Sequence, residues 1–403
     1  MSPRVPVRRR TVLLSVAALA LVLPLGTAAT ATALPSPSPQ LTLPAPTGHD
    51  LVGTTTLHLV DTSRPDPWVP TQHVRELMIQ LWYPASTVAG YPSAPWMTPS
   101  TARAYEKANG LPVLNWPITD AHVGAPVHQH RGGWPVVLYS PGLGGQRQEE
   151  TAAVEDLASH GYVVATIDHI HDSGVVELPD GSVETAAIPA FTSADEVAVT
   201  TKAIESRVAD TSFVLDQLAA IDRGDDPDYE HRPLPSGLRG ALDLDHVGMF
   251  GHSDGGSTTA HAMHVDPRIT AGVDVDGTLW TPQAIAGSDR PLLLFGRQSL
   301  DPFEASTWAE FHTNQRGPQF QLSLIGSTHS TFDDAAVLAP QVAPFLDIPP
   351  AQVTAMYGTI SGQRAAAVVR AYLNAYFGTY LRHHDSRLLS GPSARFPEVQ
   401  FVP

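Results

Sequence analysis

Residues 247–256 read VGMFGHSDGG, and this stretch does most to decide the fold. Val247–Phe250 is a short apolar run typical of a buried strand, and it leads directly into the pattern Gly-x-Ser-x-Gly at Gly251–Gly255. A tight turn from strand to helix requires small residues beside the serine, because the two elements pass close to each other. The stretch therefore predicts a strand, a strained turn that presents Ser253, and a helix whose N-terminus favours negative charge. The alternative is a plain glycine-rich turn.

Strands and helices alternate on both sides of this turn. A chain with this order favours a mostly parallel central sheet with helices on both faces. Together with the serine turn, the order predicts the α/β-hydrolase fold. Apolar runs that predict strands lie at 54–60, 75–83, 136–139, 162–167, 271–275, 291–295 and 320–325, and helical patterns lie at 152–158, 197–221 and 363–381.

The composition narrows the range of functions. The 403 residues are 42% hydrophobic and only 16% charged, which predicts a folded chain with a large core. The net charge of −16 opposes binding to a phosphate backbone, so no nucleic acid partner is expected. The chain has no cysteine, which excludes disulfides, thiolate nucleophiles and zinc–thiolate sites.

Three segments are expected along the chain. Residues 1–33 combine a basic start, an apolar stretch and small residues before a cleavage site, which is the pattern of an export signal. Arg9 and Arg10 keep both the general secretory and the twin-arginine route open, so we expect a secreted protein. Residues 34–50 are proline-rich and predict a linker, and residues 51–403 are expected to form the catalytic domain.

Residues 89–133 stand out within this domain. They are rich in proline, glycine and tryptophan and show little periodicity. We interpret them as an inserted loop or cap region near the site, although an ordinary surface excursion would have the same composition.

Acyl transfer at Ser253 requires two hydrogen-bond donors aimed at the oxyanion that forms on the attacked carbonyl. The backbone N–H of Asp254, the residue after the serine, is one expected donor. The second is expected from Ser140–Gly145, which follows the strand at 136–139 and which we call the Gly-rich loop. We predict the N–H of Leu143 for this role, because the glycines around it let the backbone approach a substrate closely. The alternative is a flexible loop without a catalytic role.

A histidine and an acid must complete the set. His329 lies just beyond the strand predicted at 320–325, and the chain order of nucleophile, acid and histidine requires a late histidine. Two aspartates compete as the acid that would orient its ring, Asp276 after the strand at 271–275 and Asp301 after the strand at 291–295. Residue types alone do not choose between them.

Two further interpretations remain open. Residues 168–172 read DHIHD, and two histidines in a loop can share a metal ion. A metal-dependent hydrolase that uses Asp168, His169 and His171 is therefore an alternative, although a polar loop at the rim of the site is favoured. A hydrolase fold that binds ligands without catalysis is another alternative, which the complete set of serine, aspartate and histidine opposes.

The motifs together resemble the platelet-activating-factor acetylhydrolase family. The resemblance rests on the loop around Leu143, on Gly251–Gly256, on Val275–Gly277 and on Gly326–His329. It extends over residues 52–346, which is most of the chain.

The resemblance implies a catalytic set of Ser253, Asp276 and His329, with Leu143 and Asp254 as oxyanion donors and with no cofactor or metal. It implies a serine esterase of the 1-alkyl-2-acetylglycerophosphocholine esterase type, which releases short or oxidised acyl chains from phospholipid-like esters and makes transient contact with lipid surfaces. A generalist carboxylesterase, lipase or polyester hydrolase of the same fold is the alternative. The chain departs from the family at Asp254, where an apolar residue is usual, and a carboxylate there disfavours an oxyanion if it points inward.

Overall fold

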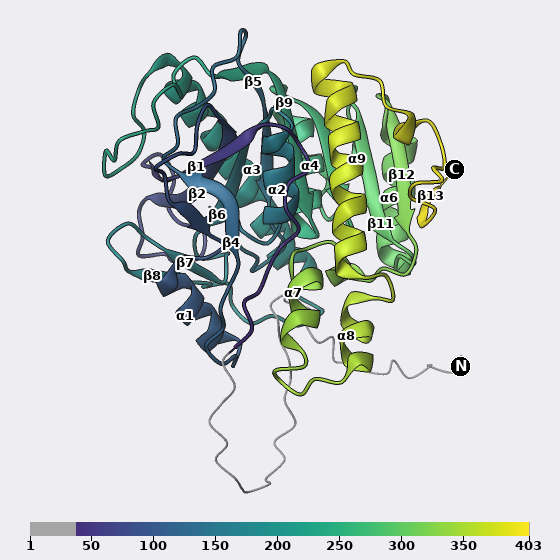
Figure 1. The fold of residues 1–403 in the computed structure, drawn as a ribbon. Coiled ribbons are helices and arrows are strands. Elements are labelled where there is room, and N and C mark those ends of the chain that lie inside the picture. Colours follow the sequence, from purple (N-terminus) through teal and green to yellow (C-terminus); the bar gives the residue numbers. More distant parts are fainter. Residues whose placement is uncertain (1–37, 403) are drawn as a thin grey trace, which may run out of the picture.

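The computed structural model describes residues 38–402, and one eleven-stranded sheet runs through them (Figure 1). Its strands are β1 (Leu51–Asp61), β2 (Arg75–Ala85), β3 (Ser93–Pro95), β4 (Ile118–Val123), β5 (Trp134–Ser140), β6 (Val163–His169), β9 (Leu242–His252), β10 (Ile269–Val275), β11 (Leu292–Arg297), β12 (Gln319–Leu324) and β13 (Val399–Phe401). The order across the sheet is β13-β12-β11-β10-β9-β5-β6-β2-β1-β4-β3. All pairs from β6 to β12 are parallel, which confirms the predicted sheet. A separate hairpin joins β7 (Val175–Glu177) and β8 (Val183–Thr185).

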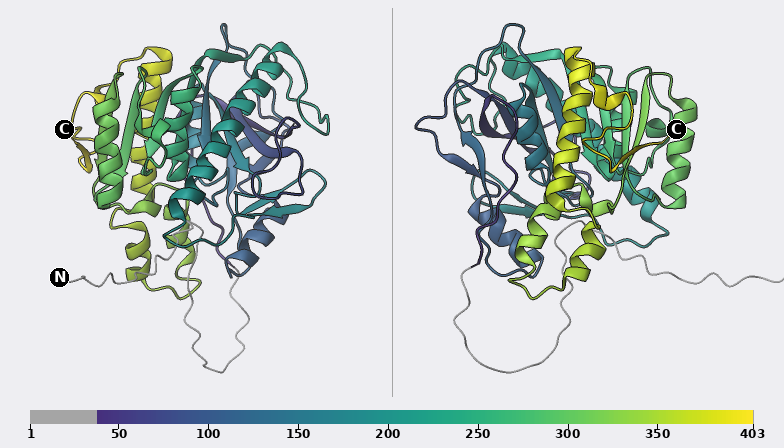
Figure 2. Two further views of the ribbon diagram at one scale, coloured as in Figure 1. Left: turned by 180° about the vertical axis from the view of Figure 1, so that it is seen from behind. Right: turned by 45° about the vertical axis from the view of Figure 1, so that its right-hand side comes forward.

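Helices cover both faces of the sheet, as Figures 1 and 2 show. They are α1 (Pro99–Ala108), α2 (Thr151–Ser159), α3 (Glu196–Arg223), α4 (Asp254–Val265), α5 (Pro282–Ile285), α6 (Pro302–Asn314), α7 (Ala335–Val342), α8 (Pro350–Tyr357) and α9 (Gly362–Arg382), with short 3₁₀ turns η1 (His329–Thr331) and η2 (Arg387–Leu389). Residues of α3, α4 and α6 belong to one apolar cluster, and residues of α2 and α9 belong to another. Between residues 38 and 402, no helix is long and apolar enough to cross a bilayer.

Strand β5 shows how the sequence builds both clusters. Val136 and Leu138 pack into the cluster on one face, whereas Val137 and Tyr139 pack into the cluster on the other. Successive side chains of a strand point to opposite faces, so a strand covered on both sides needs apolar residues at every position. This is why the central strands were recognisable as continuous apolar runs.

The predicted linker at 34–50 needs a correction. Residues 38–50 of this segment are packed against the domain. The prediction of an export signal at 1–33 lies outside the described residues. Leu41 is fully buried, and its N–H donates to the carbonyl of Asn115 at 2.9 Å. Thr47 donates through its N–H and its hydroxyl to Asp156. The prolines hold this segment extended, and its hydrogen-bonding groups therefore find partners on the domain rather than within the segment.

The segment at 89–133 is also more regular than predicted. It contains β3, α1 and β4, and β4 extends the sheet by pairing in parallel with β1. Trp96 and Trp116 stack at 5.3 Å between ring centroids and share an apolar cluster with Leu338 and Val342 of α7. The strands at this edge are too short for a periodic pattern to develop, which explains why the sequence read as an irregular loop.

Candidate active site

Ser253 lies at the turn between β9 and α4 in a strained backbone conformation. Its φ is 57° and its ψ is −123°, values that non-glycine residues rarely adopt. The turn is also crowded, because a Cβ at Gly255 would lie 1.9 Å from the carbonyl oxygen of Ser140. A Cβ at Gly251 would lie 2.2 Å from Gly255. The glycines on both sides of the serine are therefore required by close backbone approach, as the motif predicted.

The structure brings Ser253, Asp276 and His329 together in one hydrogen-bonded line. His329 Nε2 lies 3.0 Å from Ser253 Oγ, and His329 Nδ1 lies 2.6 Å from Asp276 Oδ2. The three residues follow β9, β10 and β12, whose carboxyl ends meet at the same edge of the parallel sheet. An imidazole held between a hydroxyl and a carboxylate can take the hydroxyl proton while the carboxylate stabilises the resulting cation.

Asp276 is buried and held by an arginine. The backbone N–H of Arg297 donates to Asp276 Oδ1 at 2.6 Å, and Arg297 Nη1 donates to Oδ2 at 2.7 Å. Burial alone would raise the pKa of Asp276, but the hydrogen bond from His329 and the charge of Arg297 outweigh it and lower this pKa to about 2. The same guanidinium forms an ion pair with Glu304 at 2.5 Å. The carboxylate of Asp276 therefore stays ionised beside the histidine.

His329 has a raised pKa. Burial favours its neutral form, but the hydrogen bond to Asp276 and the negative charge of that carboxylate prevail. The neighbouring His252 behaves in the opposite way, because burial and the charge of His329 lower the pKa of His252 to about 3. Neutral His252 lies 3.0 Å from the backbone carbonyl of His329 through Nε2, and the two rings are 4.6 Å apart. His252 thus supports the turn that carries His329.

Asp301, the other candidate acid, does not approach the histidine. Its Oδ1 accepts from the N–H groups of Phe303 and Glu304 at 2.9 and 3.0 Å, so it caps the N-terminus of α6. Its side chain is 57% exposed. The aspartate accepts hydrogen bonds from N–H groups that have no partner within the helix, and Pro302 at the first helical position fixes the backbone there. The geometry therefore selects Asp276 over Asp301.

The Gly-rich loop lies against the serine. A Cβ at Gly142 would be 3.3 Å from the Cβ of Ser253. Within residues 38–402, the N–H groups of Leu143 and Asp254 donate to no protein acceptor. Asp254 is the first residue of α4, where backbone N–H groups have no partner within the helix. Both predicted donors are therefore free to bind a ligand oxygen.

The side chain of Asp254 is buried beside these donors. Burial raises the pKa of Asp254 to about 6, against the charge of Arg207, which lowers it. A hydrogen bond with Trp280 also lowers the pKa of this carboxyl. Trp280 and Phe303 pack at 5.4 Å between ring centroids, and Phe303 is 52% exposed. An aromatic surface thus adjoins the serine turn.

The segment 168–172 is not the rim loop that we favoured. Asp168, His169 and Asp172 are almost completely buried. His169 Nδ1 lies 2.8 Å from Asp210, whereas His171 Nδ1 lies 2.9 Å from Asp66. The described part of the chain has no group of three His, Asp or Glu residues placed to hold a metal ion. The two histidines instead bind different aspartates, and Arg75 forms ion pairs with both of these carboxylates.

Sequence reasoning missed Arg297, Glu304 and His252. A charged residue at the end of an apolar strand was the available signal for Arg297. His252 was visible inside the serine motif, but nothing in the sequence placed it against His329.

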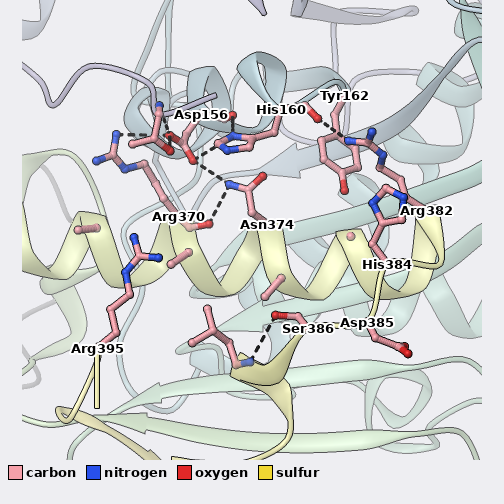
Figure 3. Close-up of a pocket in the computed structure, with 16 residues that line it drawn as sticks. Asp156, His160, Tyr162, Arg370, Asn374, Arg382, His384, Asp385, Ser386 and Arg395 are labelled. Atoms are coloured by element: carbon pink, nitrogen blue, oxygen red, sulfur yellow. Dashed lines mark hydrogen bonds and ion pairs between the residues drawn. The ribbon is translucent and has the colours of Figure 1, made fainter. Parts of the chain in front are cut away.

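A groove of about 440 Å³ lies apart from this site, between α2, α9 and η2 (Figure 3). Asp156, Arg370, Arg382 and Arg395 are among the residues that line it. Ser253, Asp276 and His329 do not line it. We therefore do not assign it to the active site.

Comparison with known proteins gives the family. A family model described as platelet-activating factor acetylhydrolase, isoform II, matches residues 38–348. The chain belongs to this family. A probable 1-alkyl-2-acetylglycerophosphocholine esterase of Arthroderma benhamiae is 27% identical over 285 residues, which are 68% of each chain. A platelet-activating factor acetylhydrolase of Cavia porcellus is 24% identical and covers 61% of this chain and 58% of its own.

A solved structure agrees with the family assignment. The ferulic acid esterase from Streptomyces cinnamoneus is 34% identical to this chain, with a TM-score of 0.76. The match covers 91% of this chain and 100% of the esterase chain. The predicted α/β-hydrolase fold is thereby confirmed. This member of the acetylhydrolase family is a carboxylic-ester hydrolase.

Proposed function

We propose that this esterase works through an acyl-enzyme on Ser253. His329 Nε2 accepts the proton of Ser253 Oγ as that oxygen bonds to the ester carbonyl carbon. The N–H groups of Leu143 and Asp254 hold the oxyanion, and Asp276 stabilises the imidazolium. Collapse of the intermediate breaks the bond to the alcohol, which leaves with the proton from His329. Water then attacks the acyl-enzyme in the same way, releases the acid and restores Ser253.

One observation carries this proposal above all others. Ser253 Oγ, the ring of His329 and the carboxylate of Asp276 form a continuous line with distances of 3.0 and 2.6 Å. The pKa shifts support the same roles, because Asp276 is held ionised and the raised pKa of His329 favours the imidazolium that proton transfer creates.

We further propose that the substrate is an ester with a short or oxidised acyl chain on a phospholipid-like alcohol. The family match and the esterase of Arthroderma benhamiae support this substrate. A generalist carboxylesterase that accepts aromatic acyl groups is the second candidate. The aromatic pair of Trp280 and Phe303 beside the serine turn and the similarity to a ferulic acid esterase favour it.

The test compares three substrate series with the wild type and Ser253→Ala. The series are p-nitrophenyl esters from acetate to palmitate, 2-acetyl phosphatidylcholine analogues, and methyl ferulate. The proposal expects no activity in Ser253→Ala and the highest kcat/KM for acetyl and other short acyl groups. A wild-type preference for methyl ferulate would favour the second candidate, and activity in Ser253→Ala would contradict the mechanism.

We propose, finally, that the protein is exported. The basic and apolar pattern of residues 1–33 supports this. Expression in a bacterial host should yield a mature chain in the exported fraction, with an N-terminus near residue 34 by mass spectrometry. Replacement of Arg9 and Arg10 by lysine should abolish export only if the twin-arginine route is used.

A further inference from the structure

A buried ion pair between Arg207 and Asp172 holds the Gly-rich loop. Arg207, in α3, donates through Nη1 to the carbonyl of Pro141 at 2.5 Å and through Nη2 to the carbonyl of Gly142 at 2.9 Å. Asp172 accepts from the backbone N–H of Gly144 at 3.2 Å. The loop is thus fixed on both sides of residue 143, whose own N–H remains free.

The bond to Gly142 has a direct consequence for the predicted oxyanion donor. The carbonyl of Gly142 and the N–H of Leu143 belong to the same trans peptide plane and point in opposite directions. When Arg207 holds the carbonyl oxygen in the protein interior, the N–H of Leu143 must point away from the interior. Gly142 lies against Ser253, so this orientation exposes the donor on the side where the substrate carbonyl would be attacked.

The ion pair itself is built for rigidity. Arg207 is fully buried and binds Asp172 through two parallel bonds, Nε to Oδ2 at 2.7 Å and Nη2 to Oδ1 at 2.6 Å. Every nitrogen of the guanidinium is therefore bonded, either to Asp172 or to the loop. A lysine has one nitrogen and no planar fork, so it cannot make this set of bonds.

The rest of the DHIHD segment supports the same loop. His169 Nε2 lies 3.0 Å from Ser140 Oγ at the start of the loop. Asp168 Oδ1 accepts from the backbone N–H of Arg147 at 2.7 Å, just beyond its end. Two of the three possible metal ligands, Asp168 and His169, therefore anchor the ends of the Gly-rich loop, and Asp172 anchors its middle.

We propose that Arg207 and Asp172 are positioning residues for ester hydrolysis, which aim the N–H of Leu143 at the oxyanion. This inference rests on the proposed function, since it assigns the loop its part in that mechanism. A positioning role has a kinetic signature that general stability lacks. A positioning residue stabilises the tetrahedral state, and its loss therefore lowers kcat while binding of the ground-state ester stays almost unchanged.

The experiment compares Arg207→Lys and Asp172→Asn with the control Arg370→Lys. Arg370 is also buried and also binds backbone carbonyls, those of Pro44 and Ala45, but in the described chain it makes no hydrogen bond to the Gly-rich loop or to the DHIHD segment. For each variant, kcat, KM and Tm are measured with p-nitrophenyl acetate. Inhibition by an alkyl trifluoromethyl ketone, which forms a tetrahedral adduct with a serine, is measured alongside.

We expect Arg207→Lys to lower kcat by about 10²-fold, near the effect of losing one oxyanion donor, with KM changed by less than about threefold. Affinity for the ketone should fall by a similar factor to kcat. Arg370→Lys, at a comparable loss of Tm, should keep kcat within about threefold of the wild type. A loss of kcat in Arg370→Lys equal to that in Arg207→Lys would overturn the proposal.

A double variant keeps the test decisive if Arg207→Lys does not fold. Arg207→Met combined with Asp172→Leu removes both buried charges, which can preserve stability. We expect Tm to recover while kcat and ketone affinity stay low. Recovery of kcat together with Tm would show a purely structural role. Ser253→Ala in the same assay separates failure of this proposal from failure of the mechanism. Activity in Ser253→Ala would refute the mechanism. An active Arg207→Lys with an inactive Ser253→Ala would refute only the positioning role.

Discussion

Two arginines hold parts of the active site, and they differ in what they bind. Arg297, at the end of β11, binds the carboxylates of Asp276 and Glu304, and its side chain is 17% exposed. Arg207, in α3, is fully buried and binds two backbone carbonyls of the Gly-rich loop together with Asp172. Arg297 acts on carboxylates that titrate, whereas Arg207 divides its hydrogen bonds between one carboxylate and two peptide carbonyls that do not titrate.

This difference teaches how the site divides its work. On the acid side, charge sets the protonation of Asp276 and His329, so changes there should move the pH profile. On the oxyanion side, geometry sets the direction of an N–H group. Arg207→Lys keeps the positive charge that acts on Asp254, so this change should lower the rate by a similar factor at every pH. Equal shifts of the pH profile in variants of Arg297 and of Arg207 would contradict this comparison.

The largest expected effect lies on the acid side. Asp276→Asn should lower kcat by about 10⁴-fold, because the amide no longer orients the ring or stabilises the imidazolium. Steady-state hydrolysis of p-nitrophenyl acetate measures it. Asp301→Asn is the matched control and should keep kcat within about twofold, since Asp301 caps α6. Equal losses in the two variants would remove the distinction between them.

Removal of Arg297 should give a smaller loss and a shifted profile. Arg297→Met should lower kcat by about tenfold. The positive charge of Arg297 lowers the pKa of His329, so its loss raises that pKa further. Because the base must be neutral, the acidic limb of the profile, which the raised pKa of His329 sets in the wild type, should move to still higher pH. Arg207→Lys should leave this limb in place, and a shift of similar size in that variant would contradict the comparison.

Asp254 should sharpen the comparison on the oxyanion side. With a pKa of about 6, its carboxyl is neutral at low pH and negative at high pH. The negative form disfavours a nearby oxyanion, so Asp254→Asn should raise kcat/KM by about threefold at about pH 8 and leave it unchanged at about pH 5. The ratio of variant to wild type across pH is the measurement, and a constant ratio would exclude an electrostatic effect of Asp254.

The smallest effect concerns stability alone. Asp301→Ala should lower the free energy of unfolding by about 1 kcal/mol through loss of the cap of α6, with kcat unchanged. Urea unfolding of the variant beside Asp301→Ser, which retains a capping oxygen, tests it. A drop in kcat without a change in stability would return Asp301 to the catalytic set.

The serine, the histidine and the central strands could be predicted from the sequence because their signals are local. The apolar run before Ser253 and the small residues around it are dictated by the backbone of one turn. The choice between Asp276 and Asp301 needed more than residue types, although Asp301 followed by proline was a helix-start signal that argued for a cap. That signal was present and went unused.

The rest depended on contacts between residues far apart in the chain. Asp172 is buried because Arg207, in a helix well beyond it, supplies both charge and hydrogen bonds. Because the sequence does not show that partner, the charged DHIHD segment is interpreted as a surface loop or a metal site. The edge strand β4 likewise pairs with the free edge of β1, which is far from it in the chain, and β3 then pairs with β4. Such pairings leave no periodic trace in a short segment.

The central claim is that Ser253 carries the acyl group. We would react the enzyme with an alkyl fluorophosphonate and separately quench it with acid during turnover of p-nitrophenyl acetate, then locate the added mass by peptide mass spectrometry. The account predicts one phosphonyl and one acetyl adduct on the peptide that contains Ser253, both absent in Ser253→Ala, which should also be inactive. An adduct on another residue, or hydrolysis that persists in Ser253→Ala, would contradict it.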